Sequence, residues 1–184
     1  MTDGIDHHQD VLGFWFATSS KAHWFERSDA FDVEVRSRLG PLHARAMAGE
    51  IDGWAGDPKG MLALVILFDQ VPRNIHRGTP LAFATDAKAL ALARLAVDRG
   101  LDAGFETDER LFLYLPFEHS EQLADQERSV ALFRALGDAN YLDYAIRHRD
   151  VIARFGRFPH RNAVLGRPST AAELAFLEEP GSAF

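Results

Sequence analysis

Several ionisable side chains lie at helical spacings that point them toward apolar faces, where ligand binding or proton transfer could take place. His148 falls on one stripe with Tyr141, Ala145, Ile152 and Phe155. A helix would therefore turn its imidazole inward. Most inward histidines only satisfy hydrogen bonds in a core, while fewer bind a ligand or transfer protons. Both interpretations are open for His148.

Asp69 is a second polar residue on an apolar face, which it shares with Leu62, Val65 and Ile66. It also lies near the end of its predicted helix, where the helix dipole disfavours a carboxylate. A nearby cation should compensate it, and Arg73 is the simplest candidate. The pattern favours a buried structural ion pair, with a ligand-orienting or catalytic carboxylate as the alternative.

The segment Tyr114-Leu-Pro-Phe-Glu-His-Ser-Glu121 brings further ionisable groups to one region. Glu118 and His119 occur there. Leu123 begins an apolar stripe that includes Glu127, so we expect several carboxylates to turn inward. A metal site would need Glu118, His119, Glu121 and His148 to meet, which the spacing alone does not indicate. The spacing of a di-metal helical bundle is absent.

Arginines are concentrated between residues 147 and 167, which hold six of them against one aspartate. This segment carries a charge of +5, and the rest of the chain carries −12 within a net charge of −7. The acidic total argues against nucleic acid or an anionic membrane as a partner. The local arginines pair with carboxylates in the simpler interpretation and form an anion site in the other.

No sequence motif indicates a particular reaction. The chain has no glycine-rich phosphate loop, no nucleophile elbow, no paired-histidine zinc helix and no cysteine. We therefore expect no cofactor. A cytoplasmic location fits the lack of cysteine and the polar first ten residues. The longest apolar run, Met61–Phe68, is too short to span a bilayer and predicts a buried helix.

The elements that position these residues are all predicted to be α-helices within a single domain, residues 1–184. A composition of 47% hydrophobic and 26% charged residues is typical of a globular domain with a packed core. Short connections predict antiparallel pairs, in a bundle or a stack similar to tetratricopeptide repeats. We expect about eight helices, near residues 6–17, 29–49, 59–70, 85–99, 107–116, 120–136, 138–155 and from 170 onward.

Helix boundaries follow from capping residues and prolines. Ser28, Asp57 and the Thr170–Glu173 capping box mark helix starts, and Gly100 marks an end. Prolines should interrupt the helical pattern: Pro41 is expected to kink or split its helix, and Pro72 and Pro116 to end theirs.

Two segments, Phe68–Asn74 and Gly156–Asn162, each place proline shortly before arginine and asparagine after an apolar helix. The similarity suggests a weak two-fold repeat. Chance recurrence of turn residues explains it at least as well.

Five segments together resemble the bacterial domain-of-unknown-function 924 family, from Val11 to about Leu177. They are residues 67–75, 82–86, 109–121, 125–129 and 154–162. The resemblance implies an all-α fold similar to tetratricopeptide-like repeats, with no established activity. Its motifs overlap the inward polar residues and suggest one shared site formed by Asp69, Arg73, Asn74, Glu118, His119, His148, Arg157, His160, Arg161 and Asn162.

Three functions are consistent with these residues. The first, which we favour, is a binding module that holds a small anionic ligand or a peptide in a polar pocket. The second is a hydrolytic or metal-assisted enzyme that uses Glu118, His119 and His148 with Asp69. The third is a scaffold in which the inward polar groups only set the helix register.

Overall fold

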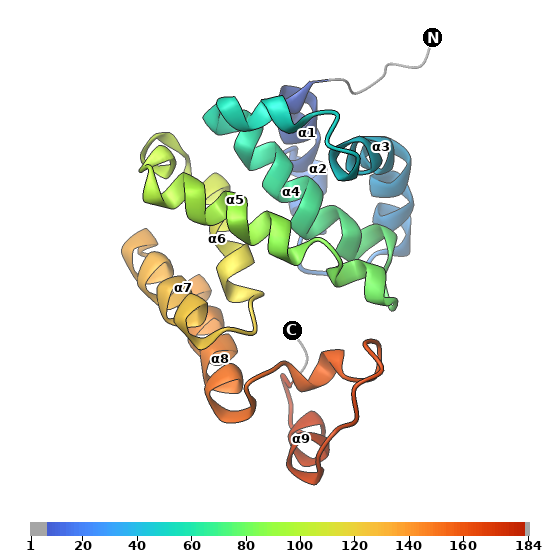
Figure 1. The fold of residues 1–184 in the computed structure, drawn as a ribbon, viewed down its shortest axis with the longest axis vertical. Helices are drawn as coiled ribbons and strands as arrows, with labels where there is room; N and C mark the ends of the chain where they lie inside the picture. Colours follow the sequence, from blue (N-terminus) through green and yellow to red (C-terminus); the bar gives the residue numbers. More distant parts are fainter. Residues whose placement is uncertain (1–6, 183–184) are drawn as a thin grey trace. The chain divides into compact units, whose positions relative to one another are not determined.

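The computed structural model describes residues 7–182 and contains helices and connecting segments (Figure 1). The chain divides into two compact units. Unit 1 comprises the residues up to 77 together with 81–116, and unit 2 comprises residues 78–80 and 117 onward. The prediction of an all-α fold is confirmed, while that of a single domain stays a prediction.

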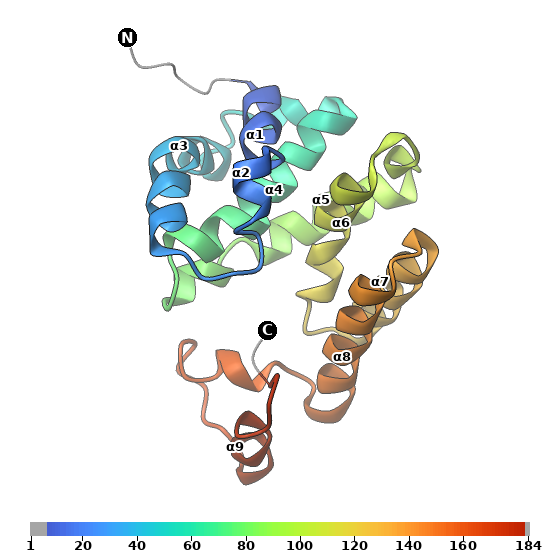
Figure 2. The ribbon, with the colours of Figure 1, turned by 180° about the vertical axis from the view of Figure 1, so that it is seen from behind.

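Helix α4, Pro58–Ile75, is the most extensively buried helix of unit 1. The bounds of the helices of this unit are α1 His8–Trp15, α2 Thr18–Lys21, α3 Asp29–Met47, α4 Pro58–Ile75, α5 Asp86–Asp98 and α6 Thr107–Glu118, whose last two residues belong to unit 2. Short 3-10 helices cover Asp52–Gly56, Pro80–Phe83 and Leu101–Gly104. α4 packs against α1, α3 and α5 (Figures 1 and 2). The Met61–Phe68 run lies within α4 and is buried, as predicted.

Unit 2 contains the helical pair α7 Leu123–Leu136 and α8 Ala139–Phe155, followed by the 3-10 helix Pro159–Arg161 and by α9 Ala171–Leu177. α7 and α8 pack along each other and are joined by only Gly137 and Asp138, so they are antiparallel, as predicted. Among residues 7–182, no helix is long and apolar enough to cross a bilayer.

Most predicted caps are present because they depend on a few neighbouring residues. The side chains of Ser28 and Asp57 accept backbone N–H groups of their own first turns, and Thr170 and Glu173 form the complete capping box. Gly100 follows α5 with φ 66°, in the left-handed region that favours glycine. One predicted start is wrong: α7 begins at Leu123, and Ser120 instead donates to the carboxylate of Asp125.

The predicted effects of the prolines are wrong at two positions. α4 continues through Pro72 to Ile75, and α6 continues through Pro116 to Glu118. α3 also remains one helix across Pro41. Pro72 has no N–H to donate to the carbonyl of Phe68, but the hydroxyl of Thr85 donates to that oxygen at 2.5 Å. A side chain from the next helix start therefore satisfies the carbonyl that proline leaves without its helical partner.

Thr85→Val is expected to destabilise unit 1 by about 1–3 kcal/mol, because the buried carbonyl of Phe68 would lose its hydroxyl donor at nearly constant volume. Denaturant unfolding followed by tryptophan fluorescence would measure it. In a Pro72→Ala background, the backbone N–H of residue 72 can again donate to the carbonyl of Phe68. Thr85→Val should then lower the free energy of unfolding by less than it does in the parent. Equal costs in the two backgrounds would contradict this explanation.

The suggested two-fold repeat is not a structural repeat. Phe68–Asn74 lies inside α4, whereas Gly156–Asn162 forms a turn and a 3-10 helix. Gly156 ends α8 and adopts φ 69°, in the left-handed region. Phe68–Asn74 is helical throughout, so no residue there has this conformation. The similarity in sequence therefore reflects the same residue types in different backbone settings.

Candidate functional site

The ten predicted site residues fall into the two units. Unit 1 contains Asp69, Arg73 and Asn74, and unit 2 contains Glu118, His119, His148, Arg157, His160, Arg161 and Asn162.

In unit 1, Asp69 forms the ion pair predicted from its spacing. Its side chain is fully buried, and Arg73 Nη1 lies 3.5 Å from its Oδ1. The same guanidinium donates to both carboxylate oxygens of Asp86, at 2.9 and 3.1 Å. Asn74 Nδ2 donates to Asp32, which also binds Arg77. These contacts link α4 to α3 and to the start of α5.

In unit 2, Glu118 and His148 form a buried carboxyl–imidazole contact. His148 Nδ1 lies 3.3 Å from Glu118 Oε1 and 2.8 Å from the carbonyl oxygen of Tyr144. Because a carbonyl only accepts, Nδ1 carries the proton of the neutral ring and Nε2 carries its lone pair. The prediction that His148 points inward is confirmed, since the residue is 5% exposed.

Phe158 connects three of the predicted residues. Its ring is fully buried and lies 5.6 Å from the ring of His148, 5.5 Å from that of His160 and 4.5 Å from the guanidinium carbon of Arg161. A single aromatic side chain therefore holds groups from α8 and from the Pro159–Arg161 turn in one cluster.

Arg161 and Gln126 bind the carbonyls at the end of α6. Gln126 Nε2 donates to the carbonyls of Glu118 and Ser120 at 2.6 and 2.7 Å, and Arg161 Nη1 donates to that of His119 at 3.1 Å. The last carbonyls of a helix lack helical partners, and the helix dipole favours a cation beside them. Arg161 thus has a structural role in addition to any ligand contact.

The histidines of this cluster are held neutral. Burial lowers the pKa of His148 to about 3, with further lowering by the positive charge of Arg161 and by His119 and His160, against a raising effect of the Tyr144 carbonyl. Burial and then the charge of Arg161 lower the pKa of His160 to about 4. The charge of Arg161 therefore adds to the effect of burial at both rings, and at His160 the charge of Glu121 opposes it.

Acid is expected to destabilise unit 2 below about pH 6.5, where these two histidines gain protons in the unfolded chain but stay neutral in the folded one. The free energy of unfolding should fall by up to about 1.4 kcal/mol per pH unit for each ring, until the pH reaches the folded pKa values. Unfolding by circular dichroism at about pH 7.5, 6 and 5 would measure the slope. His148→Gln should remove about half of it. The same slope in parent and variant would contradict a buried neutral ring at position 148.

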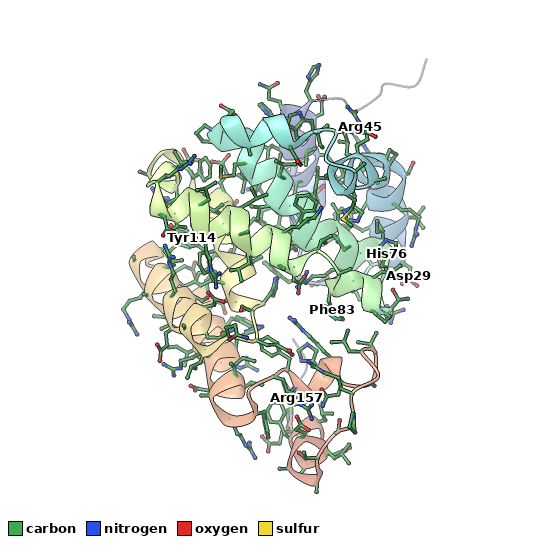
Figure 3. The ribbon with its side chains drawn as sticks, in the orientation of Figure 1. Asp29, Arg45, His76, Phe83, Tyr114 and Arg157 are labelled. Atoms are coloured by element: carbon green, nitrogen blue, oxygen red, sulfur yellow. The ribbon has the colours of Figure 1, made fainter. Side chains whose placement is uncertain are left out.

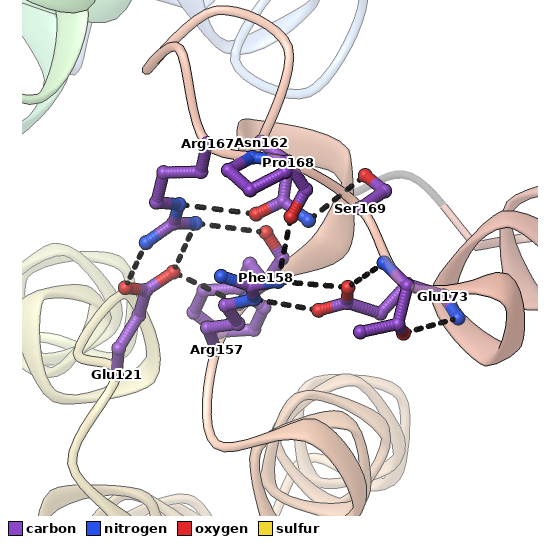
Figure 4. Close-up of polar contacts among 9 residues, drawn as sticks. Glu121, Arg157, Phe158, Asn162, Arg167, Pro168, Ser169 and Glu173 are labelled. Carbon is purple, nitrogen blue, oxygen red and sulfur yellow. Dashed lines mark hydrogen bonds and ion pairs between the residues drawn. The ribbon is translucent and has the colours of Figure 1, made fainter.

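The segment from residue 156 to 170, on which Figure 3 labels Arg157, is fixed by two arginine–glutamate pairs (Figure 4). Arg167 donates to both oxygens of Glu121, at 2.7 and 2.9 Å, and Arg157 to both oxygens of Glu173, at 2.6 and 2.8 Å. Glu121 also accepts the backbone N–H of Phe158. Although burial raises the pKa of Glu121, its hydrogen bonds with Arg167 and Phe158 outweigh this effect and lower it.

Asn162 and Arg157 belong to this supporting network. Asn162 is fully buried, accepts from Arg167 Nε and donates to Ser169 Oγ, each at 3.0 Å. The pKa of Glu173 is held well below its usual range by Arg157 and by the backbone N–H and hydroxyl of Thr170. Both predicted residues therefore position the segment that carries His160 and Arg161.

Four residues of unit 2 were not predicted from the sequence, and one prediction there was wrong. Phe158, Gln126, Ser129 and Arg167 were not predicted as site residues, although Gln126 and Ser129 share a stripe with Val130 and Phe133. This helical spacing could have identified Gln126 and Ser129 from the sequence. Glu127 is exposed, as is Leu123, because the buried face of α7 is set by this other stripe. Among residues 7–182, no group of three or more acidic, histidine or cysteine side chains is arranged to hold a metal ion.

Comparisons with known proteins agree with the sequence resemblance. The family model described as a bacterial protein of unknown function, DUF924, matches residues 11–181. A solved structure of a protein of unknown function from Agrobacterium tumefaciens is 42% identical, with a TM-score of 0.88, over 93% of this chain and 96% of that chain. No curated protein is similar to this chain. The chain therefore belongs to the DUF924 family of bacterial proteins of unknown function.

Proposed function

We propose that unit 2 is a binding module for a small anion, a carboxylate or a phosphate, held at Arg161 and the histidines around it. The carboxylate of a peptide terminus belongs to the same chemical class. The observation that carries the proposal is the burial of Arg161, which is only 6% exposed and contributes a positive potential at His148 and His160. An anion at this position would gain from that potential and from charge-assisted hydrogen bonds.

The structure narrows which arginines support the proposal. Arg157 and Arg167 each use a two-pronged contact with a glutamate of the same unit. A ligand would have to displace a carboxylate to use either guanidinium in the same way. The proposed site centres on Arg161, which is buried, stacks on Phe158 and lies in one cluster with His148 and His160.

Thermal melting with inorganic phosphate, malate and succinate would test the proposal, with sodium chloride at equal ionic strength as the reference. A saturable rise in melting temperature is expected, because a ligand that binds only the folded state stabilises it. Arg161→Met should weaken binding at least about tenfold, a loss of about 1.4 kcal/mol. Arg154→Met is the matched control, since Arg154 is exposed on the same arginine-rich segment.

Arg161→Met also removes a helix-end contact, so its own melting temperature should fall. Arg161→Lys separates the two effects, because it retains the charge without the planar fork and should bind with intermediate affinity. The proposal would be overturned if no anion gave saturable stabilisation of the parent or of Arg154→Met. Equal affinities of the parent and Arg161→Met for the anion would also overturn it.

A second candidate is acid–base catalysis, favoured by the contact between Glu118 and Nδ1–H of His148. Such a contact fixes the tautomer that leaves Nε2 as the base. With a pKa of about 3, this ring is a weak base at neutral pH. Catalysis is therefore less well supported than anion binding. If the protein hydrolysed a phosphate or carboxylate ester and His148→Gln lost this activity, catalysis would become the better supported function.

A further inference from the structure

His160 and Arg161 are consecutive residues that contact the same aromatic ring. The ring of His160 lies 5.5 Å from that of Phe158, and the guanidinium carbon of Arg161 lies 4.5 Å from it. Both residues belong to the 3-10 helix Pro159–Arg161, so the backbone keeps their side chains in one region of unit 2. A change of charge at one of them therefore acts on the other at short range.

The titratable and charged groups around His160 come from the turn after α6, from α8 and from its own segment. They are His119, Glu121, His148, Arg161 and Arg167. After burial, the charge of Arg161 has the largest effect on the pKa of His160, and both effects lower it. Glu121 raises this pKa, but its carboxylate already pairs with Arg167. Arg161 is therefore the charge that opposes protonation of His160 most strongly.

An anion paired with the guanidinium of Arg161 would offset this opposing charge. Protonation of His160 would then add a second cation and an N–H donor beside the ligand, where hydrogen bonds between opposite charges are stronger than neutral ones. Coupling between two bound species is reciprocal. An anion that favours the protonated ring is therefore bound more tightly, by the same factor, once the ring is protonated.

We propose that anion binding at Arg161 is coupled to the uptake of a proton by His160, so that the site binds its ligand more tightly in acid. This inference rests on the proposed function, since it assigns the regulation of that same site. Without ligand, the pKa of His160 is about 4, and with ligand it should move toward the ordinary histidine value of about 6.5. His148 is less suited to this role, because its pKa is lower, at about 3.

A pH titration of the histidine rings by NMR on the full chain would test the coupling. Malate and inorganic phosphate are the probes, with sodium chloride at equal ionic strength as the reference. A saturating anion should raise the pKa of His160 by about one unit or more, which corresponds to a coupling of about tenfold. The ring of His7, exposed in unit 1, should titrate in the same way with and without the anion.

Titration calorimetry at about pH 5 and pH 7.5 would measure the same coupling as an affinity ratio. Malate and phosphate gain protons themselves in this range, so the ratio is compared between the parent and its variants. His160→Gln should lower the ratio about twofold or more, because it has no ring to take up the proton. His7→Gln is the matched control and should keep the ratio of the parent.

The two measurements separate the coupling from the anion site itself. If malate or phosphate bound without raising the pKa of His160, or if His160→Gln kept the parent ratio, the coupling would be wrong and the anion site would stand. If neither anion bound at either pH, both would be wrong. Backbone assignment identifies the His160 signal in the parent, so the ring titration decides alone if His160→Gln does not fold.

Discussion

Replacing Phe158 with alanine is expected to lower the free energy of unfolding of unit 2 by about 3–5 kcal/mol, the usual effect of removing a buried aromatic ring. The ring is fully buried, packs near Val151 and Ile152, and contacts His148, His160 and Arg161. Its loss would leave a cavity where the cluster is held together. Anion binding at Arg161 should therefore weaken together with stability.

The tryptophans allow this effect to be assigned to a unit. Trp15, Trp24 and Trp54 all lie in unit 1, whereas circular dichroism reports both units. Phe158→Ala should shift the dichroism transition, and Leu174→Ala, at a side chain 55% exposed in unit 2, should leave it nearly unchanged. Comparable shifts for the two variants would contradict the role of Phe158. A tryptophan transition that moves with the dichroism would support the single-domain prediction, because the units would then unfold together.

Arg73→Met should destabilise unit 1 by about 3 kcal/mol, because it leaves two carboxylates without the cation between them. Asp69 is fully buried and Asp86 is largely buried, so water cannot replace the guanidinium effectively. Breaking a buried ion pair from one side is costly even where the intact pair adds little stability. Tryptophan fluorescence during denaturant unfolding would measure the change.

The control for Arg73 is an ion pair of the same spacing on the surface. Arg38 and Glu34 are also four residues apart in one helix, but their side chains are 49% and 52% exposed. Arg38→Met should therefore change stability by less than about 1 kcal/mol. A double variant, Arg73→Met with Asp69→Leu, should recover part of the loss, since it removes the buried charge. No recovery would show that the loss does not come from Asp69.

Local patterns account for the features that sequence analysis predicted well. Ser28, Asp57 and the Thr170–Glu173 box cap their own helices within three residues. The pairing of Asp69 with Arg73 is also local, because residues four apart share a helix face. Pro72 and Pro116 were wrongly predicted to end their helices, because that prediction used only the local rule that proline interrupts a helix. At Pro72, the donor that relieves the helix comes from Thr85, which lies 17 positions from Phe68.

The amino-acid sequence by itself determined the helical class, most helix boundaries, the inward direction of His148 and the family, because periodicity, capping and motifs act over short stretches of chain. Only the tertiary structure decided which polar groups meet. Arg167 pairs with Glu121 across 46 positions, Arg161 reaches His119 across 42, and Phe158 joins three polar side chains. Such contacts depend on how α7, α8 and the following turn pack, and side-chain spacing carries no information about partners that far apart. Packing therefore decided that Arg161 contacts Phe158 and the carbonyl of His119.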